Sequence, residues 1–232
     1  MVQIKKFTFN ILGTNCYIVW EEGSGKCIIA DPGMYRGFER DEVLTYLSRE
    51  GLTPEAILLT HAHFDHVWGV QPLVEAFGCP VYLSRKDDEV LRAHSRYIRK
   101  AGLKTQVELF DYQDINDGDI LEKGGCLWKV IATPGHTPGC VCYYCEKAGI
   151  LLSGDTLFQG SIGRTDLEGG NYDDLIRSIM DSLMGLPGDT DVLPGHGAAT
   201  SIGREAMTNP FLIPFNEPIP DWNAEGLSLD GE

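Results

Sequence analysis

The amino-acid sequence predicts an α/β (α+β) protein in which two β-sheets are covered by helices. Short apolar runs, typical of buried strands, occur in both halves of the chain, around residues 16–59 and 120–153. Segments with helical periodicity follow the strands of each half, and helices packed on sheets form a layered fold. The 232 residues contain no internal repeat and no linker-like change of composition, so we expect one domain spanning residues 1–232.

The first half of the chain is predicted to begin with β-structure and to continue with alternating helices and strands. Residues 2–9 alternate loosely between polar and apolar and indicate an edge strand. The runs 16–20 and 26–30 flank the Gly-rich segment 21–25, which is typical of a hairpin connection. A helix is expected over 40–50, because Val43, Leu44 and Leu47 share one face and Gly51 can end it. Further strands are predicted at 57–60 and 81–83, and further helices at 67–77 and 86–100.

The second half is predicted to form another sheet before a final helix and strand. The strands are expected at 120–122, 126–132, 140–145 and 150–153, the helix at 173–183 and a short strand at 191–193. The segment 209–223 contains four prolines. Because proline interrupts regular structure, we expect the tail at 209–232 to be largely irregular.

Histidines and aspartates gather directly after the strand-like runs. The segment Thr60-His61-Ala62-His63-Phe64-Asp65-His66 is followed later by Gly135-His136, Gly154-Asp155 and Gly195-His196. Glycine at such positions lets the chain turn sharply and approach an ion closely. The candidate metal ligands are therefore His61, His63, Asp65, His66, His136, Asp155 and His196.

This pattern points to a metal centre. Side chains at the ends of neighbouring buried strands are held by the sheets and converge where water can enter. His61 and His63, two positions apart in an extended turn, face the same way, while Asp65 and His66 can serve a second position nearby. Asp155 is the candidate for a carboxylate that bridges two cations. Imidazole and carboxylate ligands suit Zn²⁺, with Fe or Mn as alternatives, so we expect two divalent metal ions.

An isolated histidine is most often a polar surface residue. We expect this of His94, which lies inside the helix predicted over 86–100.

The histidine motif resembles that of the metallo-β-lactamase superfamily, whose H-x-H-x-D-H signature is matched at residues 61–66. The resemblance implies a four-layer αββα sandwich. It implies that His61, His63 and His136 hold one metal, that Asp65, His66 and His196 hold the other, and that Asp155 bridges them. It also implies that Asp31 orients the first ligands, although a turn before Pro32 explains an aspartate there equally well.

Two further segments, 154–167 and 194–205, resemble the small single-domain type II glyoxalases, which are hydroxyacylglutathione hydrolases. These enzymes cleave thioesters such as S-lactoylglutathione. The motif Gly163-Arg164-Thr165-Asp166 is shared with persulfide dioxygenases, and Arg164 and Asp166 either pair with each other or touch substrate. Longer type II glyoxalases carry basic groups for glutathione in a C-terminal helical region, whereas here Arg204 is the single basic residue after His196.

The hypothesis for function is a binuclear metallohydrolase that cleaves a small-molecule thioester through a metal-bridging hydroxide. Asp65 is the candidate catalytic residue, which would bind metal and orient the hydroxide. A thiolate leaving group, with a pKa of about 8.5, needs little help from a general acid. One alternative is a persulfide dioxygenase with a single iron, in which Asp65, His66 and His196 would be spare. Another is a lactonase or other ester hydrolase on the same scaffold.

The net charge of the protein limits its binding partners, and its cysteines indicate its cellular compartment. The formal net charge is −15, which disfavours binding to nucleic acid or to an anionic membrane. Neither a signal peptide nor a run of about 20 apolar residues is visible. Seven scattered cysteines, an odd number, argue for a reducing cytoplasm. Cys142 and Cys145 have C-x-x-C spacing but would face opposite sides of a strand, so we expect buried thiols rather than a second metal cluster.

Overall fold

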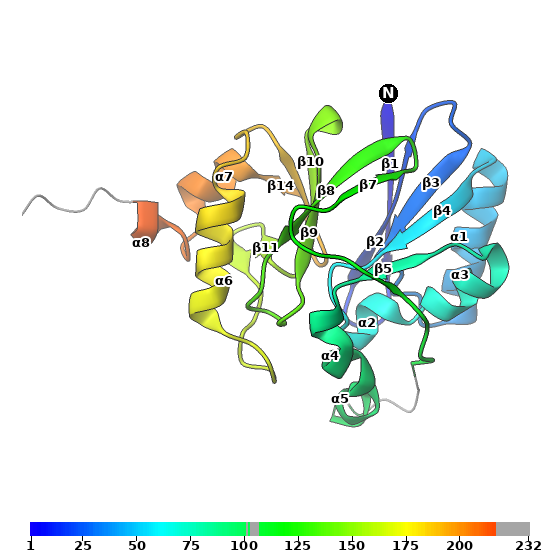
Figure 1. The fold of residues 1–232 in the computed structure, drawn as a ribbon, viewed down its shortest axis with the longest axis horizontal. Helices are drawn as coiled ribbons and strands as arrows, with labels where there is room; N and C mark the ends of the chain where they lie inside the picture. The colour runs from blue at the N-terminus through cyan, green and yellow to red at the C-terminus, as the bar shows by residue number, and fades with distance from the viewer. Residues whose placement is uncertain (101, 103–106, 217–232) are drawn as a thin grey trace, which may run out of the picture.

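Two six-stranded sheets pack face to face in the computed structural model, which describes residues 1–100, 102 and 107–216. Helices cover the outer face of each sheet, with α1 and α3 on one side of the molecule and α6 and α7 on the other (Figure 1). The order of layers is therefore helix, sheet, sheet, helix. This confirms the αββα sandwich expected from the sequence.

The first sheet has the strand order β1-β2-β3-β4-β5-β6. The first three strands pair antiparallel, and the last three are added in parallel, which places the carboxyl ends of β3, β4 and β5 at one edge. The strands are β1 (Val2–Phe9), β2 (Thr14–Glu21), β3 (Lys26–Ala30), β4 (Thr53–Leu58), β5 (Val81–Leu83) and β6 (Gln113–Asp114). The helices of this half are α1 (Gly37–Glu50), α2 (Phe64–Val67), α3 (Val70–Phe77), α4 (Asp88–Arg92) and α5 (His94–Lys100).

The second sheet has the strand order β14-β13-β10-β9-β8-β7. Its strands are β7 (Ile120–Lys123), β8 (Cys126–Ala132), β9 (Val141–Cys145), β10 (Ile150–Gly154), β13 (Asp191–Pro194) and β14 (Thr200–Ser201). A separate hairpin consists of β11 (Leu157–Phe158) and β12 (Ser161–Ile162). The helices are α6 (Tyr172–Ser178), which continues as a π-helical turn at Ile179–Leu183, α7 (Ile202–Thr208) and α8 (Ile213–Asn216).

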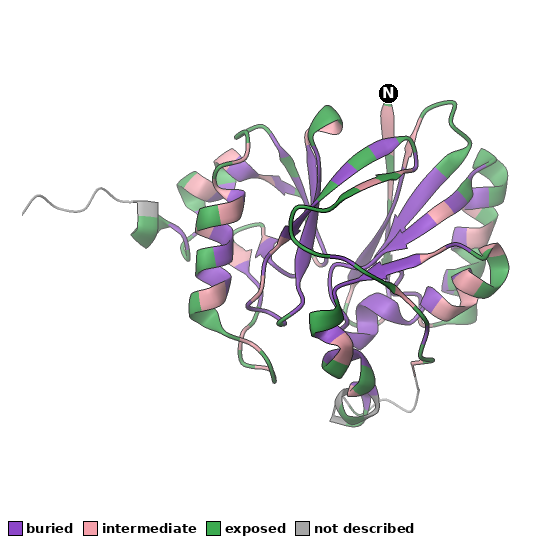
Figure 2. Cartoon of the chain, viewed as in Figure 1, coloured by how far each residue is buried: buried purple, intermediate pink, exposed green. Residues whose placement is uncertain are grey.

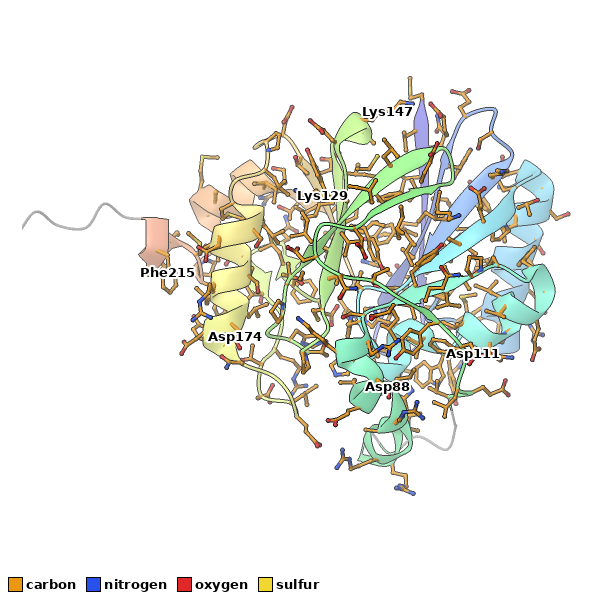
Figure 3. All side chains as sticks on the ribbon, viewed as in Figure 1. Asp88, Asp111, Lys129, Lys147, Asp174 and Phe215 are labelled. Atoms are coloured by element: carbon orange, nitrogen blue, oxygen red, sulfur yellow. The ribbon has the colours of Figure 1, made fainter. Side chains whose placement is uncertain are left out.

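The core is divided into layers because strand side chains alternate between faces. In β3, Ile28 points between the two sheets, where it joins a cluster containing Trp128 and Tyr143. The next residue, Ile29, packs on the outer side with Val43 of α1. Figure 2 shows buried residues throughout the strands between the helical layers. Charged side chains such as Lys129 and Lys147 extend from the surface (Figure 3).

The predicted helices 67–77 and 86–100 are both interrupted in the structure. The first begins three residues late, as α3, because Val67 ends the short helix α2 and the chain then turns at Gly69, whose N–H donates to the carbonyl of Pro32 at 2.7 Å. A Cβ at Gly69 would lie 2.7 Å from that carbonyl oxygen, so the chain needs glycine for this approach. The predicted helix 86–100 becomes a 3₁₀ turn, α4 and α5. Helical periodicity alone contains no information about such tertiary contacts.

Other differences are at element boundaries and in very short elements. Helix α1 begins at Gly37 rather than at 40, because the Glu39 carboxylate accepts the N–H groups of Tyr35 and Arg36 at 2.7 and 2.8 Å. The sequence did not predict α2, β6, β11, β12, β14 and α7. In the expected irregular tail, Ile213–Asn216 form α8, while residues 217–232 lie outside the described part of the chain, so the irregular tail stays a prediction. The single-domain assignment also stays a prediction.

All seven cysteines are free thiols with buried side chains. Cys142 packs in the cluster under α6, whereas Cys145 packs between the two sheets, so the two face opposite sides of β9 as expected. No group of metal-binding side chains found among the described residues includes a cysteine. In the same part of the chain, none of the helices is both long and apolar enough to cross a membrane.

The hydroxyl group of Tyr143 links the two sheets, because it donates to the carbonyl of Leu59 at 2.8 Å. Replacing it in a Tyr143→Phe variant takes this donor away from a buried carbonyl. We expect the free energy of unfolding to fall by about 1–3 kcal/mol, measured by urea denaturation. Tyr172→Phe on the exposed surface of α6 is the control, and equal stability of the two variants would contradict the prediction.

Candidate metal centre

The seven predicted ligands all lie at one edge of the sandwich, where strands of both sheets end. His61 and His63 follow β4, and Asp65 and His66 lie in the short helix α2. From the second sheet, His136 lies in the turn between β8 and β9, Asp155 directly follows β10, and His196 comes two residues after β13. The folded chain therefore brings together side chains that are up to 135 positions apart in the sequence, from His61 to His196 (196 − 61 = 135).

Three groups among the described residues have ligand atoms within 4.8 Å of one another; two consist of the predicted ligands alone, and the third joins Asp31 to His61 and His66. In the first group, of His61, His63 and His136, His63 Nδ1 lies 2.8 Å from His136 Nε2. In the second group, of Asp65, His66 and His196, the two histidine Nε2 atoms lie 3.3 Å apart. The division into two groups of three is the one implied by the family resemblance.

Asp155 lies between the two groups. Its Oδ2 atom is 3.5 Å from Nε2 of His136 in the first group and 3.5 Å from Nε2 of His196 in the second. Its Oδ1 atom is 3.5 Å from His66 Nε2. A carboxylate with oxygens facing both groups has the geometry required of a bridging ligand.

Hydrogen bonds from the outer ring nitrogens orient several of the imidazoles. His136 Nδ1 donates to the carbonyl of Arg164 at 2.7 Å, and His196 Nδ1 donates to the carbonyl of Leu12 at 3.1 Å. A neutral histidine that donates from Nδ1 carries its lone pair on Nε2. In both residues Nε2 faces Asp155, so the tautomer presents a ligand atom to the centre.

Asp31 is connected to both ligand groups. Its Oδ2 atom accepts His66 Nδ1–H at 3.0 Å and the Thr60 hydroxyl at 2.7 Å, while Oδ1 accepts the Thr60 N–H at 2.8 Å. The Thr60 oxygen in turn lies 3.0 Å from His61 Nδ1. These contacts support the interpretation of Asp31 as a residue that orients ligands, in addition to its place in a turn.

The electrostatics of the cluster favour bound positive charge. Burial lowers the pKa of His61, and the neighbouring histidines lower it further, so this ring is neutral. Burial also opposes a charge on His66, but Asp65, Asp155 and Asp31 outweigh it and raise the pKa of His66 to about 10. The carboxylates therefore attract either a proton or a metal cation to this position.

Asp65 remains ionised in spite of its burial. Desolvation alone would raise its pKa, but the charge of His66 and hydrogen bonds from His196 and Thr14 hold its pKa well below the usual range. The Thr14 hydroxyl, at the start of β2, donates to Asp65 Oδ2 at 2.7 Å. This hydrogen bond orients the carboxylate, and nothing in the sequence around Thr14 indicated it.

The residues present fit a divalent metal pair. Two buried atoms of the cluster, His61 Nε2 and Asp155 Oδ1, have no hydrogen-bond partner within the protein. Buried polar atoms are nearly always satisfied, so such atoms indicate a bound group. Neutral imidazole nitrogens together with carboxylate oxygens are suitable ligands for Zn²⁺ and also for Fe or Mn.

His94 contradicts the expectation of a surface residue. Its exposed fraction is 3%, and its Nε2 atom donates to the carbonyl of Ala62, between His61 and His63. The reason is the break at Ala93, which turns α5 against α2, where Ile98 packs on Phe64 and Trp68. The spacing of four between His94 and Ile98 places both on one helix face and was a signal for this burial.

A cavity of about 800 Å³ opens over the candidate metal centre. Arg164 and Asp166 lie at its rim, where the guanidinium donates two hydrogen bonds of 2.7 Å to the carboxylate. The pair is largely exposed, so the structure is compatible with either role considered for these residues. Apolar side chains form much of the remaining wall, namely Leu12, Phe64, Phe158, Ile162 and Leu167.

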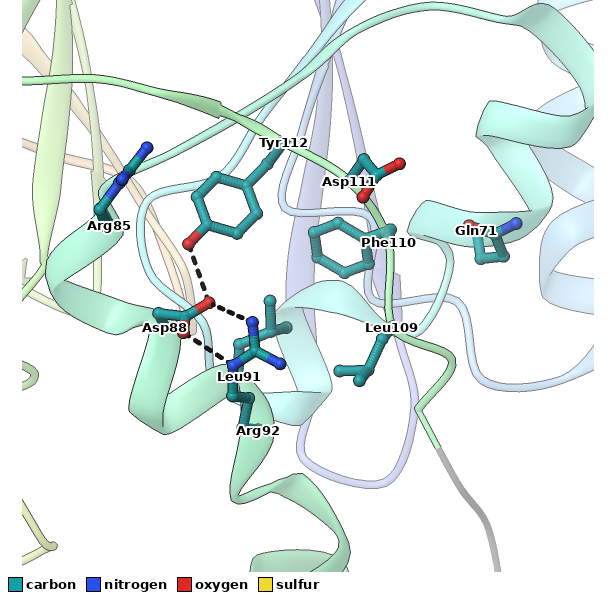
Figure 4. Close-up of a pocket in the computed structure, with 9 residues that line it drawn as sticks. All are labelled: Gln71, Arg85, Asp88, Leu91, Arg92, Leu109, Phe110, Asp111 and Tyr112. Atoms are coloured by element: carbon teal, nitrogen blue, oxygen red, sulfur yellow. Dashed lines mark hydrogen bonds and ion pairs between the residues drawn. The ribbon is translucent and has the colours of Figure 1, made fainter.

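A second pocket, shown in Figure 4, differs in its chemistry. Its Arg92 guanidinium is paired with Asp88 at 2.7 Å, and the Tyr112 hydroxyl donates to the same carboxylate at 3.0 Å. Arg85 at the edge is paired with Asp114 at 3.5 Å. The charges of Arg85, Asp88 and Arg92 are thus paired, while Asp111 faces solvent. None of the buried, unpartnered side-chain atoms found among the described residues belongs to this pocket.

Protons should compete with metal at His66, whose pKa is about 10. At neutral pH the metal-free protein holds a proton there, and a cation must displace it. We expect the apparent affinity for Zn²⁺ or Co²⁺ to rise roughly tenfold per pH unit between about pH 6 and pH 9. Competition with a chromophoric chelator measures this, and a pH-independent affinity would contradict it.

Comparison with known proteins shows which family shares this arrangement. The family model described as the metallo-beta-lactamase superfamily matches residues 10–196. The probable metallo-hydrolase YqgX of Bacillus subtilis is 42% identical over 195 residues, covering 82% of this chain and 89% of that protein. The hydroxyacylglutathione hydrolase GloC of Haemophilus influenzae is 34% identical over 201 residues, covering 85% and 92%.

Solved structures share the fold over nearly the whole described chain. The crystal structure of the BLEG-1 B3 metallo-beta-lactamase aligns with a TM-score of 0.82 and 41% identity, covering 90% of this chain and 99% of that one. The structure of TTHA1623 in a di-iron-bound form aligns with a TM-score of 0.81 and 39% identity, covering 90% and 100%. With a family model that matches most of its length and relatives that align almost end to end, this chain belongs to the metallo-β-lactamase superfamily and is a metallo-hydrolase of that superfamily.

Proposed function

We propose that this protein is a binuclear metallohydrolase that cleaves a small-molecule thioester such as S-lactoylglutathione. The observation that carries the proposal is the position of Asp155, whose Oδ2 atom lies 3.5 Å from a histidine of each ligand group. A carboxylate between two ligand groups supports a pair of metal ions. The persulfide dioxygenase, in which Asp65, His66 and His196 would be spare, is the alternative, and the similarity to ETHE1 from Myxococcus xanthus, with a TM-score of 0.73 and 25% identity, supports keeping it in the test.

The two groups of candidate ligands would each hold one cation. His61, His63 and His136 would hold one ion, and Asp65, His66 and His196 the other, with Asp155 shared. Two divalent ions supply Lewis acidity, which lowers the pKa of a water molecule and polarises a carbonyl group. Zn²⁺ is the first expectation for this ligand set, and the similarity to a di-iron-bound structure supports iron as the alternative.

Asp65 is the candidate catalytic side chain of the protein itself. The hydrogen bond from Thr14 leaves the other carboxylate oxygen of Asp65 available to a water molecule, and the low pKa of Asp65 keeps it an acceptor at neutral pH. Asp65 also lines the cavity that would contain the substrate. It can therefore orient an attacking water towards a bound carbonyl group.

The walls of the cavity suit a thioester with an apolar portion. Phe64 and Phe158 line it, together with other apolar side chains, and these exclude water from the reacting carbonyl. The departing thiolate is stable enough to leave with little proton donation, because thiols have a pKa of about 8.5. The similarity to GloC supports a hydroxyacylglutathione as substrate, and the similarity to a B3 metallo-β-lactamase supports ester or lactam hydrolysis as the alternative.

The cysteines and the net charge of the chain support the compartment and the class of substrate that we propose. Seven buried free thiols are compatible with a reducing compartment, which supports a cytoplasmic location. The net charge of −15 supports a small-molecule substrate rather than a nucleic acid.

The proposal predicts rapid, chelator-sensitive release of thiol from S-lactoylglutathione. We expect activity to disappear after treatment with a strong chelator and to return when Zn²⁺ is added. Thiol release is followed with a chromogenic thiol reagent, and metal content by elemental analysis. Metal-loaded protein that releases no thiol would overturn the thioester assignment, and oxygen consumption with glutathione persulfide would then test the dioxygenase.

The bridging role of Asp155 predicts the joint loss of metal and activity. In Asp155→Asn one carboxylate oxygen becomes an amide nitrogen, which is not a metal ligand. We expect at least one metal ion per chain to be lost and the rate to fall on the order of 100-fold or more. Asp181→Asn, at an exposed position, is the matched control. A variant at 155 that kept both full metal content and full rate would refute the bridging scheme.

A further inference from the structure

One fully buried carboxylate near the metal centre has no place among the candidate ligands. Asp87 ends the 3₁₀ turn Arg85–Asp87 that follows β5, and its exposed fraction is 0%. Its oxygens accept three hydrogen bonds, from the N–H of Ala62 at 2.8 Å, the hydroxyl of Thr137 at 2.8 Å and the N–H of Gly139 at 2.6 Å. The sequence contained no motif that singled out this residue.

The three donors belong to the two loops that carry the first ligand group. Ala62 lies between His61 and His63 in the loop after β4 of the first sheet. Thr137 and Gly139 follow His136 in the turn between β8 and β9 of the second sheet. The carboxylate of Asp87 therefore ties together two loops from different sheets.

A carboxylate is suited to this position because every contact with it is a donor. Burying a charged group is costly unless hydrogen bonds compensate it, and three donors to one carboxylate provide this compensation. Burial raises the pKa of Asp87, and the hydrogen bonds from Ala62, Thr137 and Gly139 act in the opposite direction. An amide in its place would direct an N–H group towards one of the donors.

The hydrogen bond between the Gly139 N–H and Asp87 requires glycine at position 139. A Cβ atom at this position would lie 2.6 Å from Asp87 Oδ1, which is closer than real Cβ atoms approach. The absence of a side chain lets the backbone of the β8–β9 turn reach the carboxylate.

His94 holds the same loop through a second contact. The N–H of Ala62 donates to Asp87, and the carbonyl of Ala62 accepts a hydrogen bond from His94 Nε2. Both polar groups of the residue between His61 and His63 are thus bonded to buried side chains of the segment after β5. The path of the chain between the two histidines is determined by these bonds.

We propose that Asp87, assisted by His94, is a positioning residue that sets the spacing between His61, His63 and His136 and thereby the metal affinity of this group. The proposal rests on the metal centre of the proposed function but is independent of its substrate. The hydrogen bonds of Asp87 are to Ala62, Thr137 and Gly139 rather than to a ligand ring, so its effect reaches the ligands through the two loops, together with its electrostatic interaction with His136.

The decisive measurement is metal affinity, obtained by chelator competition with Zn²⁺ and from the visible absorption bands of the Co²⁺-loaded protein. In Asp87→Asn we expect the affinity of one of the two sites to fall about 10–100-fold and the Co²⁺ bands to shift, as for other residues that support ligands. We expect the second site to change less, because none of the hydrogen bonds of Asp87 is to Asp65, His66 or His196.

Conservative pairs of variants keep the test informative if Asp87→Asn does not fold. Thr137→Val removes the hydroxyl donor at nearly the same volume, whereas Thr137→Ser retains it. His94→Leu removes the donor to Ala62, whereas His94→Gln can replace it. We expect weak metal binding in the first member of each pair and recovery in the second.

Leu47→Ala in α1 is the control for a general loss of stability, since Leu47 is buried under the first sheet and belongs to neither loop. It should lower the free energy of unfolding by about 2–5 kcal/mol while metal affinity stays unchanged. The proposal is overturned if Asp87→Asn loses stability as Leu47→Ala does but binds both metals normally. If the wild type binds two metals yet releases no thiol from thioesters, the substrate assignment fails and the affinity measurements still decide the role of Asp87.

Discussion

The candidate site depends on how the two sheets are held against each other at one edge. The N–H of Val141 in the second sheet donates to the carbonyl of Thr60 at the end of the first, at 2.9 Å. The N–H of Asn15 donates to the carbonyl of Gly195 at 2.7 Å. Because each group of candidate ligands combines side chains from both sheets, these contacts determine whether the ligand atoms meet at coordination distance.

Close approach at this edge requires glycine at particular positions. A Cβ at Gly195 would lie 2.3 Å from Asp155 Oδ1 and 2.7 Å from His66 Cε1. A Cβ at Gly154 would lie 2.2 Å from the Thr60 hydroxyl oxygen. The glycines beside Asp155 and His196 therefore allow the second sheet to approach the histidine loop of the first, which explains their place next to the candidate ligands.

Much of the fold, and the seven side chains that the structure gathers as candidate ligands, could be predicted from the sequence. The strands Lys26–Ala30, Val81–Leu83 and Cys126–Ala132 are short and apolar, and their boundaries agree with the structure. The division of the residues 86–100 could not be predicted, because it arises where α5 packs against α2, a contact between segments separated in the chain. Two-residue strands such as Thr200–Ser201 have too few side chains to produce a periodic pattern.

The sequence by itself determined the types of the seven candidate ligands and their order, because metal ligands at strand ends produce a compact pattern of His, Asp and Gly. Only the tertiary structure decided which side chains support them. Asp87 and His94 are ordinary polar residues in the sequence, and they acquire their contacts to Ala62 only when the segment after β5 folds over the histidine loop. A hydrogen bond to a backbone atom imposes no residue type on its partner, so such contacts have no local sequence signature.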